Sequence, residues 1–348
     1  MNNFKKLLIN KNISAKSALK KLDDLNSEKI LFLTNQSNEL KASLTDGDLR
    51  RGFLKGLNLE DPIFEFSNCN PKFILNNNFL QSDFNKLKKM KISVVPVLDS
   101  KRRVIDIIDV GNQLGHIPVD AILMAGGFGT RLGSLTKNTP KSLIKIQNKA
   151  IIDYSIDRLK KFGVSNFNFC LFHMKEKIKK HINNKYLDIN TNFVEEKKPL
   201  GTIGAVSLIK EIEKDYVLLM NADILTNINF SNFFENFLNE DADISVATIP
   251  HKVSIPYAVT NISKNEIISL DEKPTYTYQS NAAVYLIKKS ILKLIPKNKK
   301  FDATDLINLL IKNKKYKVLS YELNEYWSDI GTINDLQKTK KDIKNLNL

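Results

Sequence analysis

The residues with the clearest chemical potential form a glycine-rich segment followed by two cations. Gly126, Gly127 and Gly129 come directly after an apolar run, and Arg131 and Lys141 follow them. The apolar run predicts a buried strand, and the glycines let backbone N–H groups approach a polyanion closely. A helix beginning after the loop would aim its positive end at the same place. Because Arg offers a planar fork and Lys a point charge, the segment predicts a phosphate-binding site.

The spacing in this segment is neither that of a P-loop nor that of a dinucleotide-binding turn. G-G-x-G-T-R with Pro-Lys about ten residues later resembles the signature of the sugar-1-phosphate nucleotidyltransferases, and five further segments extend the resemblance over residues 120–335. The resemblance implies a nucleotide site, a sugar site and a set of catalytic residues. The nucleotide site would comprise Ala125, Gly126, Gly127, Gly129, Thr130, Glu196 and Gly201; the sugar site Glu272 and Asn281; and the catalytic set Arg131, Lys141, Asp223, Lys273 and Asp329.

Two acids in this set would hold a metal ion. Asp223 closes the sequence Asn-Ala-Asp after an apolar strand, and Asp329 lies in Trp-Ser-Asp-Ile-Gly-Thr. By resemblance both bind Mg²⁺, which favours carboxylate and phosphate oxygens; the alternative for each is a helix N-cap. Ala283 stands where the family usually has glycine, and its methyl group would crowd the sugar pocket, so the exact sugar stays open.

Glu196 bears on the choice of nucleotide. It stands five residues before Gly201, where uridylyl and thymidylyl members usually have glutamine. A carboxylate accepts hydrogen bonds from guanine N1–H and its 2-amino group together, whereas it would repel the carbonyl of uracil. This favours GTP, and the alternative is an acid on a surface loop.

The first part of the chain contains an internal repeat. Each copy reads helix, strand, turn, strand and polar helix start, and the pair resembles a CBS pair, an adenosine-nucleotide-sensing module. Thr45 and Asp48 match the ribose-binding pattern of that module, whereas Asp109 and Asn112 depart from it at the equivalent positions. The resemblance implies AMP, ADP or ATP as ligands and a homo-oligomer; the alternative is a degenerate module that only docks or dimerises.

Length and pattern predict an organisation of two domains. The chain has 348 residues, and a linker with two glycines and a proline separates a CBS pair at residues 1–116 from a catalytic domain at residues 117–348. Strands alternate with helices in the second domain, with helices expected at residues 151–162, 175–182 and 202–212. This alternation predicts an α/β fold with a doubly wound, mostly parallel sheet, preceded by an α+β CBS-pair domain.

Composition excludes several classes of partner. The net charge is +15, but the aromatic and basic interleaving of RNA-binding proteins is missing, so we expect no nucleic-acid partner. No apolar window approaches the ~20 residues of a membrane span, and the two cysteines have no metal spacing. These features predict a cytoplasmic protein.

The order of the two domains resembles that of the glucosamine-1-phosphate guanylyltransferases of bacterial legionaminic acid synthesis. This implies that GTP and glucosamine 1-phosphate give GDP-glucosamine and pyrophosphate, for nonulosonic acid or surface glycan synthesis. The alternatives are a guanylyl- or uridylyltransferase for another sugar 1-phosphate, such as mannose or heptose 1-phosphate, and an inactive nucleotide-sensing binding protein.

Overall fold

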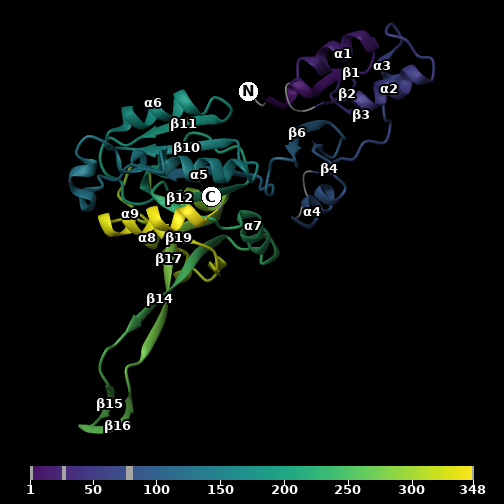
Figure 1. The fold of residues 1–348 in the computed structure, drawn as a ribbon. Coiled ribbons are helices and arrows are strands. Elements are labelled where there is room, and N and C mark those ends of the chain that lie inside the picture. The colour runs from purple at the N-terminus through teal and green to yellow at the C-terminus, as the bar shows by residue number, and fades with distance from the viewer. Residues whose placement is uncertain (1–2, 26–28, 76–80, 347–348) are drawn as a thin grey trace. The chain divides into compact units, whose positions relative to one another are not determined.

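The structure is a computed structural model that describes residues 3–25, 29–75 and 81–346. The chain divides into two compact units, one of Met1–Ile117 with Lys161–Gly163 and one of Pro118–Lys160 with Val164–Leu348 (Figure 1). Among the residues described, no helix has the length and apolar character that crossing a membrane requires.

The N-terminal unit contains two halves built to the same plan. In the first, β1 (Leu8–Asn10) runs parallel to β2 (Ile30–Thr34), and β2 runs antiparallel to β3 (Leu40–Thr45). In the second, β4 (Ile74–Leu75) is parallel to β5 (Val94–Leu98), which is antiparallel to β6 (Val104–Asp109). The helices of the unit are α1 (Ala15–Asp23), α2 (Asp46–Leu54), α3 (Ile63–Phe66) and α4 (Gln81–Lys89), with the 3₁₀ helix η1 (Asn3–Leu7) before β1. The repeat expected from the sequence is therefore present as a repeated strand order.

The two equivalent turns after β3 and β6 are closed by side chains of the repeat. Thr45 is the N-cap of α2, and Asp48 Oδ2 accepts hydrogen bonds from Thr45 N and Thr45 Oγ1 at 2.8 and 2.6 Å. The other oxygen of Asp48 accepts from Arg51. Asn112 donates to Asp109 in the second half. Since a ribose at Asp48 would have to replace these protein donors, nucleotide binding by this unit stays a prediction.

The C-terminal unit is organised around a seven-stranded sheet in the order β11-β10-β7-β12-β17-β14-β18. The parallel strands β11 (Asn190–Glu195), β10 (Asn166–Leu171), β7 (Val119–Met124) and β12 (Tyr216–Asn221) form one side. β17 (Thr275–Lys288) is antiparallel to both β12 and β14 (Ile244–Ser254), and β14 is parallel to β18 (Val318–Glu322). The predicted α/β fold with a mostly parallel sheet is confirmed.

Apolar side chains cover both faces of this sheet. One core joins Ile122, Val217 and Ile287 to the helix α8 (Ala303–Lys312) and to the 3₁₀ helices η4 (Gly204–Leu208) and η5 (Lys289–Leu294). Residues that alternate with these, such as Leu218, are also fully buried, so the strands read as continuous apolar runs. Further helices of the unit are η3 (Lys141–Leu143), α5 (Ile151–Lys160), α6 (Lys175–Lys185), α7 (Phe230–Asn239), α9 (Ile333–Asp342) and η6 (Ile343–Asn345). The short strand β8 (Lys145–Ile146) pairs with β9 (Lys149–Ala150).

Two helices expected from the sequence are not α-helices. After the glycine-rich loop the chain forms the 3₁₀ helix η2 (Thr130–Thr136), which Gly133 interrupts at φ 57° and ψ −126°. The expected helix at residues 202–212 is reduced to η4, where Gly204 packs so closely that a Cβ would lie 2.6 Å from Lys299 O. An α-helix dipole therefore does not point at the glycine loop from η2, because short 3₁₀ turns carry little aligned dipole.

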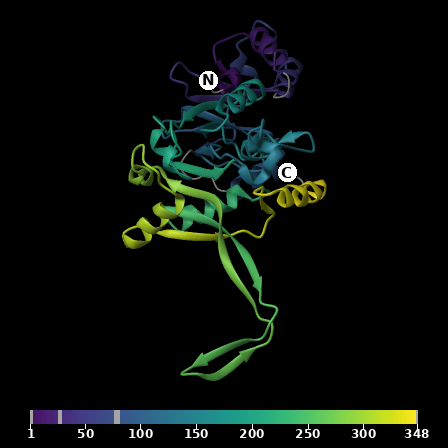
Figure 2. The same cartoon turned by 90° about the vertical axis from the view of Figure 1, so that its left-hand side faces the viewer.

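The strands β14 and β17 continue past the sheet as a two-stranded arm, which we define as residues 249–280. Within the arm, β14 and β17 pair only with each other among the residues that the structure describes, and β15 (Val259–Ser263) pairs with β16 (Glu266–Asp271) at its end. Figures 1 and 2 show the arm projecting from the body of the C-terminal unit in both views. Almost all of its side chains are exposed.

Candidate active site

The glycine-rich loop leaves the carboxyl end of β7, and its geometry requires glycine. Gly129 has φ 67°, and a Cβ there would lie 2.8 Å from Thr136 Cγ2 and 3.0 Å from Lys141 Cβ. This close approach holds the stem of Lys141 against the loop. Ala125 N donates to Cys170 O at 2.9 Å, so that N–H is already used within the sheet. The nucleotide contacts expected of Ala125, Gly126, Gly127, Gly129 and Thr130 stay predictions.

A short antiparallel pair of strands brings the two predicted metal ligands together. Asp223 follows β12 and immediately precedes β13 (Ile224–Thr226), which pairs with β19 (Trp327–Asp329) so that Ile224 lies opposite Asp329. Ile330 N also donates to Asp223 O at 3.3 Å. The backbone therefore places both acids at the carboxyl end of the central strands, where α/β sheets bind ligands.

Lys141 joins the two acids. Its Nζ forms an ion pair with Asp223 and lies 3.5 Å from Asp329 Oδ1. Its side chain is only 12% exposed, so water screens these interactions weakly. Burial and the neighbouring carboxylate of Asp223 raise the pKa of Asp329, against the opposing effects of Lys141 and Arg131. The sequence prediction that these three residues share one site is consistent with this geometry.

Three buried oxygens at this point lack hydrogen-bond partners within the described chain. They are Asp223 Oδ1, Asp329 Oδ1 and Ser142 Oγ. Lys141, Ser142 and Asp223 also line a cavity of about 30 Å³ beside Gly127, which is the space that one water or a small ion occupies. The described residues contain no group of three His, Cys, Asp or Glu side chains that could hold a metal. Asp223 and Asp329 are a pair of carboxylates, which fits an ion such as Mg²⁺, since that ion uses one or two carboxylates and takes further oxygens from substrate phosphates.

Arg131 lies beside this cluster because Gly331 leaves room for it. A Cβ at Gly331 would be 3.3–3.4 Å from three atoms of the Arg131 guanidinium, and the charge of Arg131 acts on Asp329. Thr332 then caps α9, with Asp335 completing a capping box. The Asp-Ile-Gly-Thr segment thus supplies a carboxylate, space for an arginine and a helix start in succession.

Glu196 lies against the other side of the glycine loop. Its Oε1 is 3.0 Å from the position of a Cβ on Gly126, and its Oε2 accepts a hydrogen bond from Leu200 N at 2.8 Å. Glu196 is 6% exposed, and burial raises the pKa of its carboxyl group, partly offset by the hydrogen bond from Leu200 N. The alternative of a freely exposed surface acid therefore does not describe this residue.

An aromatic group beside Glu196 was not identified from the sequence. Phe128, at the tip of the glycine loop, is 49% exposed, and its ring centroid lies 5.6 Å from that of Phe172 and 5.1 Å from that of His173. Phe172 also lines Gly126. A Phe between two glycines was the one available signal in the sequence. This surface can stack on a flat ring at typical aromatic distances.

The structure does not bring the predicted sugar residues into the cluster. Glu272 and Lys273 lie on the arm, between β16 and β17, because β14 and β17 extend beyond the sheet. Asn281 Oδ1 accepts from Ala283 N at 2.8 Å and shapes a bulge in which Ala283 has φ 54°. Their contacts with a sugar phosphate stay predictions. Gly201 has a structural explanation, since a Cβ there would lie 2.7 Å from Phe301 O.

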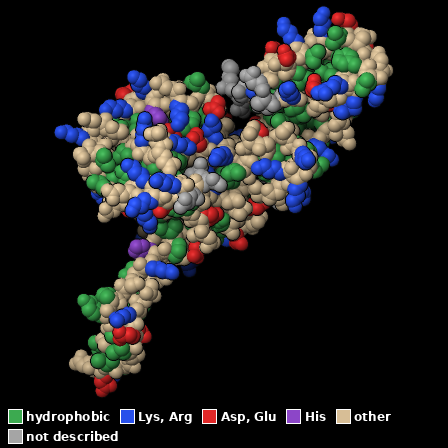
Figure 3. Space-filling model, viewed as in Figure 1, with side chains coloured by type: hydrophobic (Ala, Val, Ile, Leu, Met, Phe, Trp, Pro, Cys, Tyr) green, Lys and Arg blue, Asp and Glu red, His purple; other side chains and the backbone are tan. Residues whose placement is uncertain are grey.

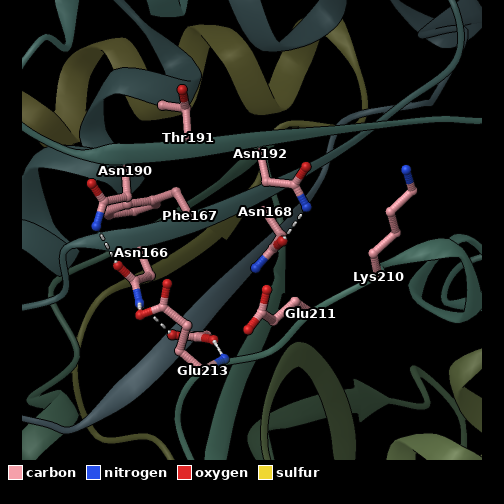
Figure 4. A pocket seen from close by; sticks show the side chains of 10 residues that line it. Asn166, Phe167, Asn168, Asn190, Thr191, Asn192, Lys210, Glu211 and Glu213 are labelled. Atoms are coloured by element: carbon pink, nitrogen blue, oxygen red, sulfur yellow. Dashed lines mark hydrogen bonds between the residues drawn. The ribbon is translucent and has the colours of Figure 1, made fainter. Parts of the chain in front are cut away.

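A second, larger pocket lies at the opposite, amino ends of β7, β10 and β11 (Figure 4). Asn166 donates to Asp120 at 3.0 Å and to Glu213 at 2.9 Å, and it accepts from Asn190 at 2.8 Å. Further along, Asn192 donates to Asn168 at 2.8 Å. These amides bond to one another, to the buried Asp120 and to the exposed Glu213, so the pocket is a polar network that joins the strand ends.

Comparison with known proteins gives one family and several relatives. Residues 120–345 match the family described as Nucleotidyl transferase. The D-glycero-alpha-D-manno-heptose 1-phosphate guanylyltransferase of Aneurinibacillus thermoaerophilus is 27% identical over 229 residues, which cover 65% of this chain and 99% of that protein. The Bifunctional protein GlmU of Methanocaldococcus jannaschii is 32% identical over 64% of this chain and 54% of that protein. The crystal structure of HddC from Yersinia pseudotuberculosis complexed with GMP-PN has a TM-score of 0.51 and 24% identity, over 65% of this chain and 99% of that one.

Proposed function

Since this chain belongs to the nucleotidyl transferase family, we propose that it transfers GMP from GTP to a sugar 1-phosphate, with release of pyrophosphate. The family match and the relatives make the chain a sugar-1-phosphate nucleotidyltransferase. We propose which nucleotide it uses, which sugar phosphate accepts the GMP, and what each residue of the site does. The observation that carries it is the contact of Lys141 with both Asp223 and Asp329 beside the glycine loop.

The choice of GTP rests on Glu196 and its surroundings. Its buried carboxylate lies beside Gly126 with one oxygen held by Leu200 N. The remaining acceptor capacity suits two adjacent N–H donors, which guanine presents and uracil does not. Phe128 and His173 would give the base a surface on which to stack. A relative named as a heptose 1-phosphate guanylyltransferase supports the same nucleotide.

The reaction would require little acid–base chemistry from the protein. The oxygen of the sugar phosphate is already anionic, and it would attack the α-phosphorus of GTP in line, so that the bond to pyrophosphate breaks as the new P–O bond forms. Arg131 would bind the departing phosphates, and Lys141 would neutralise charge near the attacking group. Catalysis would then come from positioning and charge stabilisation.

Asp223 and Asp329 would hold a divalent cation, and we propose Mg²⁺. Asp223 Oδ1 has no hydrogen-bond partner among the described residues, and Asp223 lines the adjacent cavity, which supports this role. When bound, the ion would supply Lewis-acid stabilisation of the phosphate charge. Lys141, which contacts both acids in the structure, would then turn toward substrate phosphate.

We also propose an acceptor sugar for the reaction and a ligand for the N-terminal unit. We infer glucosamine 1-phosphate as the acceptor and legionaminic acid synthesis as the setting from the resemblance in domain order, with an adenine nucleotide bound at Thr45 and Asp48. The named relative favours heptose 1-phosphate as the second candidate.

A matrix of nucleoside triphosphates against sugar 1-phosphates tests the proposal. The full chain with Mg²⁺ should release pyrophosphate fastest with GTP and glucosamine 1-phosphate, and an Asp223→Asn variant should be the inactive control. A fastest rate with GTP and heptose 1-phosphate would correct the sugar and leave the nucleotide. The absence of pyrophosphate with every pair would overturn the proposed reaction.

A further inference from the structure

We propose that the arm, residues 249–280, is the surface through which two copies of this chain associate. The arm includes Glu272 and Lys273, for which contacts with a sugar phosphate are predicted, but the proposal rests on the apolar side chains of the arm and not on the proposed reaction. It starts from the apolar side chains of the arm. Eight large ones are exposed: Val253, Tyr257, Ile262, Ile267, Ile268, Leu270, Tyr276 and Tyr278. Figure 3 shows hydrophobic side chains along the arm on the face in view.

The exposure is too extensive for isolated surface residues. Ile262, Ile267 and Ile268 are 64–66% exposed at the end of the arm. Ile262 lies opposite Ile267 in the strand register, and Leu270 follows Ile268 by two residues, so both faces of the ribbon carry aliphatic side chains. Contiguous apolar patches on soluble proteins mark interaction sites.

The backbone of the arm is also incompletely paired. In the described residues β15 and β16 form a separate two-stranded sheet, so each has one edge without a neighbour. A two-stranded ribbon alone is marginally stable in water, and open edges pair readily with another chain. An added strand on either edge would supply both the missing hydrogen bonds and cover for the aliphatic side chains.

The charge of the arm favours a second copy as its partner. The chain as a whole carries +15, whereas the arm contains three lysines and three acids, which cancel; the six are Lys252, Lys264, Lys273, Glu266, Asp271 and Glu272. Two strongly cationic chains repel each other over most of their surfaces but not through a neutral arm with both signs of charge. An anionic membrane or nucleic acid would be drawn to the cationic surfaces instead.

A two-fold arrangement would use the same surface twice. In an isologous dimer each arm contributes the same patch, so every exposed aliphatic side chain counts in both copies. A specific interface buries about 1,000 Å² or more in total, which is the area that the paired arms would have to cover. The structure thus points to a dimer joined by the arms, in which the strands of both copies form one larger ribbon.

Sedimentation velocity of the full chain at low and high micromolar concentration tests this. The wild type should sediment with the mass of at least two chains, and Ile268→Asp combined with Leu270→Asp should halve that mass. Each lost aliphatic contact should raise the dissociation constant by about tenfold or more. Leu187→Asp is the matched control, because Leu187 is 86% exposed in the same unit but outside the arm; it should sediment like the wild type.

Circular dichroism and thermal unfolding establish that the variants are folded. Should the double variant misfold, Ile262→Asp on the other strand must give the same loss of association. If the wild type sediments with the mass of one chain, the proposal is overturned, even if the arm binds another protein or a membrane. An arm variant that is folded and keeps the wild-type mass would overturn it equally.

Discussion

Replacing Asp329 by asparagine should make the ligand-free protein more stable and the enzyme far less active. In the structure Asp329 is partly buried, and burial together with the charge of Asp223 raises its pKa despite the nearby Lys141. The ionised carboxylate therefore costs stability when no ion is bound. Asparagine keeps the shape of the side chain and removes that cost.

The expected gain is at most about 1 kcal/mol, because the side chain of Asp329 is 42% exposed and solvent screens much of the cost of its charge. For a unit of this size that corresponds to roughly 2–4 °C in the Tm of the C-terminal unit. It should be measured in EDTA, so that bound metal ions do not stabilise the wild type. The same substitution removes a charged ligand, so kcat for pyrophosphate release should fall by about a hundredfold or more. The Mg²⁺ concentration needed for half-maximal rate should rise.

Asp335 gives a matched control in the same segment. It accepts from Thr332 N at 2.7 Å and from Thr332 Oγ1 at 2.8 Å in the capping box of α9. Asp335→Ala should lower stability by about 1 kcal/mol through loss of the cap and keep kcat close to that of the wild type. An Asp329→Asn enzyme that is destabilised like Asp335→Ala, or that keeps kcat within about threefold of wild type, would refute the assignment of Asp329 as a charged ligand.

Four further outcomes follow from the site. Glu196→Gln should lower kcat/KM for GTP by about 30-fold or more, the loss of ~2 kcal/mol in charge-assisted hydrogen bonding, and an unchanged GTP-to-UTP ratio would contradict this. Burial raises the pKa of Glu196, so the carboxylate of the wild type should become protonated at a higher pH than an exposed carboxyl group. As the pH falls, kcat/KM for GTP should therefore decrease, and Glu196→Gln should not show this decrease. Phe128→Ala should raise KM for GTP several-fold with little change in kcat, through lost stacking worth about 1 kcal/mol; an equal fall in kcat would argue against a stacking role. Gly331→Ala places a methyl group 3.3 Å from the Arg131 guanidinium. It should lower kcat by about tenfold through misplacement of that arginine and leave the thermal unfolding temperature unchanged. Full activity would show that Arg131 does not act from this position.

Local sequence patterns predicted the elements that carry the site but not how some of them end. The apolar runs predicted the central strands β7 and β12, since buried parallel strands need little else. The glycine spacing predicted a tight loop, and the positive φ of Gly129 agrees with it. That η2 and η4 would be 3₁₀ rather than α-helical depended on close packing at Gly204 and on the backbone of Gly133, which are tertiary effects.

The meeting of Asp223 and Asp329 came from family resemblance rather than from spacing. Its physical cause is the pairing of β13 with β19, which joins segments far apart in the sequence, and no local pattern reports such a pairing. The arm is the clearest feature that the sequence did not predict. Polar and apolar residues alternate in residues 249–280, which is compatible with strands inside the sheet and with strands that project from it. The positions of Glu272 and Lys273 could therefore not be derived from the sequence.

The ratio of kcat/KM for GTP over that for UTP, measured on the full chain with saturating sugar 1-phosphate, tests the central claim of guanylyl transfer most directly. We expect this ratio to reach about a hundred or more, because a buried acceptor such as Glu196 meets two donors on guanine and a carbonyl on uracil. A ratio near one, or a preference for UTP, would contradict the account.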